Sequence, residues 1–176
     1  MGTEDIVKVK LLREEALVPA RGTLGSAGWD LHAVDGLTVD PGCSALVGTG
    51  LAMELPVGTY GRLTSRSSMM VKGVNVGPGV VDRDFRGEIK VLVMNGSDQS
   101  YVINPGDRVA QMVIEKVYEG ELKTVRDLGE SYRGSGGFGS TGVRSLRVDR
   151  RWRIVRSSRR AGSKPGATYV RGTAEV

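Results

Sequence analysis

Short apolar segments separated by glycine and proline turns recur along most of this chain, and they constrain its fold more than any other feature. The turns include Asp40-Pro41-Gly42, Pro56-Val57-Gly58-Thr59 and Asn104-Pro105-Gly106-Asp107. Proline fixes φ and glycine reaches conformations closed to other residues, so such turns reverse the chain within a few residues. Many short segments joined in this way predict an all-β fold.

Apolar alternation predicts strands over residues 6–12, 37–39, 45–47, 51–55, 60–63, 101–103, 108–116 and, last, 122–125. One short helix is predicted over Ser67–Lys72. The length of 176 residues allows one domain with a real core, and no hydrophobic run approaches a membrane span.

The sequence has one cysteine, Cys43, and one histidine, His32. An intramolecular disulfide is therefore impossible, and a Cys/His zinc site is not expected. The first residues lack the apolar stretch of a secretory signal. We therefore expect a cytoplasmic or nuclear protein that is not secreted.

Charge divides the chain in two. From Val143 onward there are ten Lys/Arg and two acidic residues, a charge of +8, and since the whole chain carries +5, the first 142 residues carry −3. We expect the basic tail, 143–176, to be disordered. Clustered arginines with Trp152 between them, over Arg144–Arg160, are compatible with contact to nucleic acid or an anionic surface. A solvated segment or a nuclear-import signal explains them as well.

The stretch Gly73–Met94 is predicted to be a β-hairpin with acidic residues at its tip. Its valines lead into Gly77-Pro78-Gly79 and Asp82–Gly87, and an alternating apolar strand leads out. Backbone donors, a carboxylate and an aromatic ring thus lie within a few residues of one another, and a nucleoside needs all three. A turn with solvated charges is the alternative interpretation.

Three other places carry polar groups with two interpretations each. Asp30, between two apolar neighbours at an expected strand start, either caps a turn or lies near a metal. The hydroxyls around Arg66, at the predicted helix start, form either an anion site or a plain N-cap. Gln111, on an otherwise apolar strand face, needs a partner that is either backbone or a ligand.

Half of the ten residues in Arg133–Gly142 are glycine. A flexible linker is one interpretation. A linker has no need of Arg133 or Phe138, however, whereas a segment that folds over a ligand would use the guanidinium for a phosphate and the ring for a planar group.

Together these stretches resemble the five motifs of the homotrimeric dUTPase family, in the family's order. The motifs are SAGWDLHA (26–33), GRLTSRSSM (61–69), GPGVVDRDFRGEIKV (77–91), GDRVAQMV (106–113) and RGSGGFGSTG (133–142). The resemblance implies a jelly-roll-like β-barrel over 1–130 with one short helix, a flexible glycine-rich active-site arm over 131–142, and a trimer whose active sites are each shared by three chains. It implies hydrolysis of dUTP to dUMP and pyrophosphate with Mg²⁺, which limits uracil in DNA and supplies dUMP for dTMP synthesis.

The same resemblance implies roles for individual residues. Asp82 would accept the sugar 3′-OH and activate the attacking water, Phe85 would pack under the deoxyribose, and Asp30 would orient a water on Mg²⁺. The remaining implied contacts are Arg66, Ser67, Ser68 and Gln111 for phosphates, the backbone near Gly79, Val80, Val81 and Lys90 for uracil, and, from the arm, Arg133 for the γ-phosphate, Phe138 for stacking and Gly139 and Ser140 for closure.

Three residues depart from the family's usual pattern. Phe85 stands where tyrosine is usual, Ser68 replaces a glycine, and Trp29 stands where tyrosine is common. Two alternative functions remain. A dCTP deaminase of the same fold would need a catalytic glutamate where this chain has Leu92. The other alternative is a non-catalytic nucleotide-binding regulator.

Overall fold

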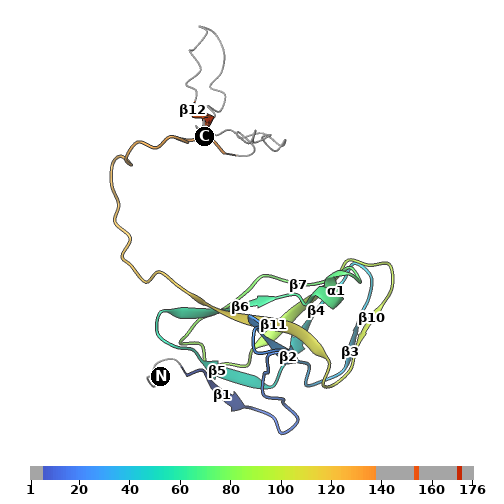
Figure 1. The fold of residues 1–176 in the computed structure, drawn as a ribbon. Helices are drawn as coiled ribbons and strands as arrows, with labels where there is room; N and C mark the ends of the chain where they lie inside the picture. The colour runs from blue at the N-terminus through green and yellow to red at the C-terminus, as the bar shows by residue number, and fades with distance from the viewer. Residues whose placement is uncertain (1–5, 138–152, 155–169, 172–176) are drawn as a thin grey trace, which may run out of the picture. The chain divides into compact units, whose positions relative to one another are not determined.

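A computed structural model of the chain describes residues 6–137, 153–154 and 170–171, and the chain forms two compact units, Met1–Glu121 and Leu122–Val176. The first unit is built almost entirely of strands (Figure 1). In chain order its elements are β1 (Lys8–Leu11), β2 (Gly28–His32), β3 (Leu37–Val39), β4 (Ser44–Gly48), β5 (Leu51–Glu54), β6 (Thr59–Thr64), α1 (Ser67–Met70), β7 (Val74–Val76), β8 (Gly79–Val81), β9 (Lys90–Asn95), β10 (Tyr101–Ile103) and β11 (Arg108–Lys116).

All strand pairs in the part of the chain that the structure describes are antiparallel. One sheet has the order β2-β11-β6-β8 and a second has the order β4-β9-β7, while β1 pairs with β5 and β3 with β10. The predicted all-β, jelly-roll-like class is confirmed, as is a single short helix within the described part of the first unit. No helix among the described residues is long and apolar enough to cross a bilayer.

One hydrophobic core joins the two larger sheets. Strand β9 shows how the alternation builds it, because Val91 and Val93 are fully buried while Leu92 and Met94 remain exposed. Buried side chains from β2, β6, β8 and β11 complete the same cluster from the other sheet, among them Leu31, Leu63, Val81 and Met112.

The hairpin predicted over Gly73–Met94 is right for β7 and β9 but wrong for β8. Strand β7 pairs with β9, but β8 pairs with β6 in the other sheet, with Gly79 opposite Leu63. The chain crosses between sheets at Gly77, whose N–H donates to the Leu92 carbonyl at 2.8 Å. A Cβ at Gly77 would lie 2.9 Å from Leu92 Cδ2, so glycine permits this close crossing. Period-2 alternation selects a face for each residue but does not select the partner strand.

The strand predicted over 122–125 is also wrong, since the described residues 117–137 contain no strand and Leu122 is fully exposed. Apolar alternation forms a strand only where a partner supplies the hydrogen bonds. In the basic tail, β12 (Arg153–Ile154) pairs with β13 (Val170–Arg171). The rest of that tail, and residues 138–142 of the arm, lie outside the described residues.

Asn95, at the end of β9, is a buried polar side chain whose hydrogen-bonding capacity is filled. Its Nδ2 donates to the Val39 carbonyl at 2.8 Å and the Gln99 carbonyl at 2.7 Å, and its Oδ1 accepts from the Ser97 N–H at 3.0 Å and the Ser97 hydroxyl at 2.7 Å. One side chain therefore joins β3, β9 and the loop that leads to β10.

We predict that Asn95→Ala lowers the free energy of unfolding by about 2 kcal/mol or more, because it leaves buried carbonyl and amide groups without partners. Urea unfolding at one fixed chain concentration measures this loss. Asn75→Ala, at an exposed position of the adjacent strand β7, is the matched control. Equal stability of the two variants would contradict the role given to Asn95.

A charged cluster joins β6 to β11 on the surface. Arg62 Nη2 lies 2.6 Å from Glu115 Oε1, and the Tyr60 hydroxyl donates to Glu115 Oε2 at 2.5 Å. The hydrogen bond from Arg62, followed by that from Tyr60, lowers the pKa of Glu115 to about 2. The same contact with Glu115 raises the pKa of Tyr60.

Because the pKa of Glu115 is lower in the folded protein than its ordinary value of 4.5, its contribution to stability is present above that value and is lost as pH falls toward about 2. We predict that Glu115→Gln reduces stability at neutral pH and weakens the dependence of stability on pH across this window. Urea unfolding midpoints at several pH values test this, with exposed Glu14→Gln as the control. An unchanged pH profile would contradict the assignment.

Candidate functional site

A pocket of about 300 Å³ opens where β2, β11 and the start of α1 meet. Its lining is polar and comes from three separate stretches of the chain. The lining residues are Gly22, Ser26, Gly28, Asp30, Arg66, Ser67, Ser68, Arg108 and Gln111. Five of the sequence-predicted site residues thus lie together: Asp30, Arg66, Ser67, Ser68 and Gln111.

The register of β11 assembles this pocket. Gln111 lies opposite Asp30 of β2 on one side and opposite Thr64 of β6 on the other. Two residues after Thr64 the chain reaches Arg66, which precedes α1. One row across the sheet therefore brings three motifs that are far apart in the sequence to one place.

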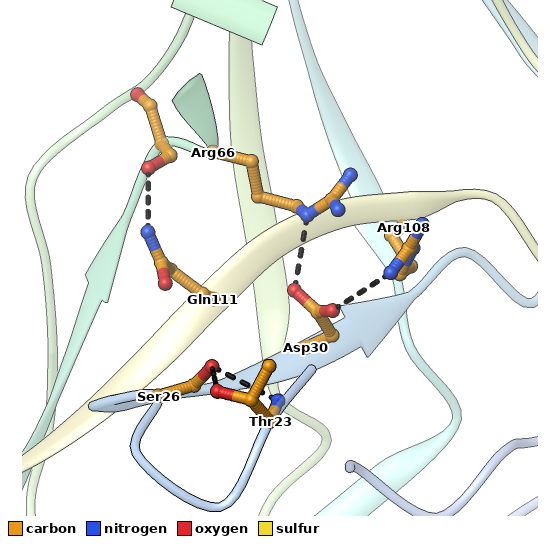
Figure 2. Close-up of polar contacts among 7 residues, drawn as sticks. Thr23, Ser26, Asp30, Arg66, Arg108 and Gln111 are labelled. Carbon is orange, nitrogen blue, oxygen red and sulfur yellow. Dashed lines mark hydrogen bonds and ion pairs between the residues drawn. The ribbon is translucent and has the colours of Figure 1, made fainter. Parts of the chain in front are cut away.

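Asp30 lies between two arginines, as Figure 2 shows. Arg66 Nε donates to Asp30 Oδ1 at 3.0 Å, and Arg108 Nη1 donates to Asp30 Oδ2 at 3.2 Å. The Asp30 side chain is only 14% exposed, so this carboxylate requires cationic partners. Asp30 is the third residue of β2 rather than a turn cap.

Arg108 reaches Asp30 because a β-bulge interrupts the register between Arg108 and Ala110. The bulge also explains why Val109 is fully buried although Gln111 and Val113 are only half-buried. His32 lies opposite Arg108. Burial, the largest cause, lowers the pKa of His32, so at neutral pH its imidazole adds no charge beside the arginines.

Gln111 has a backbone partner. Its Nε2 donates to the Ser65 carbonyl at 3.0 Å, which fixes the side chain beside the pocket. Gly28 makes room for it, because a Cβ there would lie 2.3 Å from Gln111 Oε1. Of the two partners that the sequence allowed, the structure thus shows the protein backbone.

The serines around Arg66 do not cap the helix. The N-cap residue is Arg66 itself, without a side-chain cap hydrogen bond. Ser65 is buried, and its hydroxyl accepts from the Val76 N–H at 2.8 Å. Ser67 and Ser68 are exposed and line the pocket. Two serines and two arginines therefore line the same pocket, an arrangement suited to an anion.

The predicted nucleoside-binding residues lie elsewhere in the same chain. Asp82 is exposed and begins the turn that follows β8, where the Phe85 N–H donates to its carbonyl at 3.1 Å. Phe85 is 44% exposed and its ring covers Gly87, at which a Cβ would lie 2.7 Å from Phe85 Cζ. Arg86 Nη1 donates to the Arg83 and Phe85 carbonyls at 2.7 and 3.1 Å and so stabilises the turn.

Strand register separates this turn from the pocket. Val81 lies opposite Gly61, whereas Arg66 follows the other end of β6. Five residues of extended chain span about 16 Å, so Asp82 and Arg66 lie at opposite ends of the β6–β8 pair. Val80 is exposed, and Lys90, on β9, contacts Glu88 at 3.4 Å. None of Gly79, Val80, Val81, Asp82, Phe85 and Lys90 lines the pocket.

Arg133 belongs to the second unit, where its Nε donates to the Gly136 carbonyl at 2.7 Å. Phe138, Gly139 and Ser140 lie outside the described residues. Sequence reasoning missed Gly22, Ser26, Gly28 and Arg108 as lining residues, although the last three lie inside the quoted motifs. Their place depends on register and on the bulge, and neither can be read from composition.

The side chains of the described residues show whether the pocket suits a Mg²⁺ ion. The described residues include no group of three His, Cys, Asp or Glu side chains that could hold a metal. Asp30 is the one carboxylate that lines the pocket. A single carboxylate beside an anion pocket suits Mg²⁺, which retains waters and takes its other ligands from phosphates.

Comparisons with known proteins agree on one family. The dUTPase family model matches residues 14–142. The chain is 45% identical over 138 residues to the deoxyuridine 5′-triphosphate nucleotidohydrolase of Eremothecium gossypii, which covers 77% of this chain and 90% of that protein. It is 42% identical over 142 residues to the Saccharomyces cerevisiae protein of the same name, covering 80% and 97%.

Solved structures give the same result. The Staphylococcus bacteriophage 80alpha dUTPase with dUpNHpp has a TM-score of 0.74 and 30% identity, covering 79% of this chain and 99% of that one. A mutant dUTPase from phage phi11 of S. aureus, described as coordinating a structural Mg(II) ion, has a TM-score of 0.66 and 27% identity, covering 69% and 97%.

We predict that Gly28→Ala lowers the free energy of unfolding by about 1–3 kcal/mol, because its Cβ displaces Gln111 from a packed strand. Gly25→Ala is the control, since a Cβ there meets nothing within 4 Å. Urea unfolding of both variants measures the difference. If Gly28→Ala were as stable as Gly25→Ala, the close approach of Gln111 to Gly28 would not hold.

Proposed function

The chain belongs to the dUTPase family and is a dUTP diphosphatase, and we propose that Asp82 activates the water that converts dUTP to dUMP and pyrophosphate. The observation that carries this proposal is the presence in one chain of two complementary half-sites. One is a polar pocket with two arginines, and the other is an exposed turn with Asp82 and Phe85.

In the proposed reaction, the oxygen of a water molecule bonds to the α-phosphorus of dUTP. The bond from that phosphorus to the oxygen bridging it to the β-phosphorus breaks, and pyrophosphate leaves with the electron pair. The Asp82 carboxylate takes the proton from the water. The same residue accepts a hydrogen bond from the sugar 3′-OH, which places the nucleotide relative to the base.

Two features of the turn support this role. Asp82 is exposed, and no hydrogen bond or ion pair of its side chain is found within residues 6–137, so the carboxylate is available for substrate. Phe85 presents an apolar ring three residues later. A ring packed under the deoxyribose leaves a 2′-hydroxyl without a partner, which favours deoxynucleotides. The backbone of Gly79, Val80 and Val81 and the strand at Lys90 would read the uracil.

We assign the triphosphate to the pocket of Arg66, Ser67, Ser68 and Gln111. Asp30 would hold Mg²⁺ through a water. Bound there, the ion would neutralise phosphate charge and polarise the α-phosphate. Arg133, Phe138, Gly139 and Ser140 of the arm would then close over the nucleotide.

The opposite placement of the two half-sites in one chain supports a trimer with shared active sites, because the pocket of one copy needs the turn of another. An exposed apolar face on the β4-β9-β7 sheet offers a contact surface for such copies. Leu46 lies opposite Leu92 there, and both are exposed, as is Met94 on the same strand as Leu92.

Two further expectations belong to this proposal. The protein would act in the cytoplasm or nucleus, where it limits uracil in DNA and supplies dUMP for dTMP synthesis. Contact between nucleic acid or an anionic surface and residues 144–160 of the basic tail stays a separate prediction.

A panel of deoxynucleoside triphosphates with Mg²⁺, in which pyrophosphate and ammonia are read together, tests the function. We expect pyrophosphate from dUTP, little from the other nucleotides, and no ammonia from dCTP. Asp82→Asn should lower turnover at least a hundredfold while dUTP still binds, because general-base catalysis contributes about 10²–10⁴-fold. Asp98→Asn, exposed in the loop between β9 and β10, is the control.

Each of the other outcomes would indicate a different function or a different base. Ammonia from dCTP would indicate a deaminase, and nucleotide binding without product would indicate a regulator. Full turnover by Asp82→Asn would remove Asp82 as the base without changing the overall reaction.

A further inference from the structure

Arg108 occupies the pocket without a role in the reaction proposed above. It comes from the first residue of β11, and its side chain lines the pocket together with Arg66. Its Nη1 contacts the Asp30 carboxylate oxygen that Arg66 leaves free, so the two guanidinium groups flank one carboxylate (Figure 2).

We propose that Arg108 is a second anion-binding arginine of this pocket, and that Asp30 holds it in place until a phosphate chain arrives. The inference rests on the proposed function, because it assigns the phosphate chain of the nucleotide, and the pyrophosphate product, as the ligand. The inference adds Arg108 to the binding residues of the pocket. It also gives Asp30 a second task, which is to hold Arg108 in place in the protein without ligand.

The charges in the pocket favour this assignment. Two guanidinium groups and one carboxylate leave a formal charge of +1, and pyrophosphate is a multiply charged anion. Asp30 is mostly buried and holds both cations within hydrogen-bond distance. Two arginines fixed in this way can contact neighbouring phosphate groups, because each guanidinium offers several donors in a planar fork.

The two arginines differ in a way that assigns them different tasks. The Arg66 side chain is 23% exposed and bonds Asp30 at 3.0 Å, whereas that of Arg108 is 51% exposed and bonds it at 3.2 Å. Arg66 is therefore the fixed member of the pair. Arg108 is the member that can leave Asp30 for a ligand, since an exposed ion pair is weak and competes with solvent.

A purely structural role makes a different prediction. If Arg108 served only to neutralise Asp30, its removal would change stability slightly and leave anion binding to Arg66, Ser67 and Ser68. If Arg108 binds the anion, its removal weakens binding of a phosphate chain even when no nucleoside is present. Inorganic pyrophosphate is therefore the probe that separates the two.

The experiment is calorimetric titration of the full chain with inorganic pyrophosphate, without metal, at low salt. We expect Arg108→Gln to weaken binding at least tenfold, and Arg108→Lys to weaken it about threefold, because lysine keeps the charge but loses the fork. Arg13→Gln is the matched control. Arg13 forms another exposed pair with an aspartate, its Nη1 lying 2.6 Å from Asp35 Oδ2, and this variant should bind like the wild type.

Three results would overturn the inference. The first is wild-type pyrophosphate affinity in Arg108→Gln, or, should that variant fail to fold, wild-type affinity in Arg108→Lys. The last is the absence of saturable pyrophosphate binding by the wild type. The proposed function is tested separately by dUTP turnover. Loss of pyrophosphate affinity in a protein that does not hydrolyse dUTP would refute that function and leave the role of Arg108 standing. Normal dUTP turnover with unchanged pyrophosphate affinity in Arg108→Gln would refute the role of Arg108 and leave the proposed function standing.

Discussion

The register of β11 between β2 and β6 is the constraint on which the rest of the site depends. Gln111 has Asp30 on one side and Thr64 on the other, and Arg66 follows directly on β6. A shift of one residue would turn Gln111 toward the core and bring Met112 toward the pocket. The buried Met112 and the space left by Gly28 both oppose such a shift, so packing of the core also positions the polar groups.

Whereas the register of β11 brings distant motifs together, the crossing of the chain between sheets at Gly77 separates strands that are close in the sequence. Strand β7 stays with β9, while β8 joins β6 and runs away from α1. Asp82 therefore lies at the far end of the β6–β8 pair from Arg66. A single copy thus holds the polar pocket and the Asp82 turn at opposite ends of one strand pair. The proposed reaction, in which both act on one nucleotide, therefore requires more than one copy.

Buried polar groups in this protein act as connectors between strands. Asn95 joins β3, β9 and a loop, and Ser65 joins the segment before α1 to β7. The pocket follows the same rule, since Asp30 is mostly buried and each of its carboxylate oxygens accepts a hydrogen bond from an arginine, Arg66 or Arg108. Burial without these partners would be costly, so the charges of the pocket are also part of the fold around it.

The sequence by itself determined the all-β class, the bounds of β3, β10 and β11, the short helix and the family. Turn residues and alternation are local, and five motifs in order identify a family without a structure. Only the tertiary structure decided that β8 leaves the hairpin, that no strand forms over 122–125, that Ser65 connects strands instead of capping α1, and that Arg108 shares Asp30 with Arg66. Each of these depends on which strand pairs with which, and pairing is set by long-range packing that local patterns do not encode.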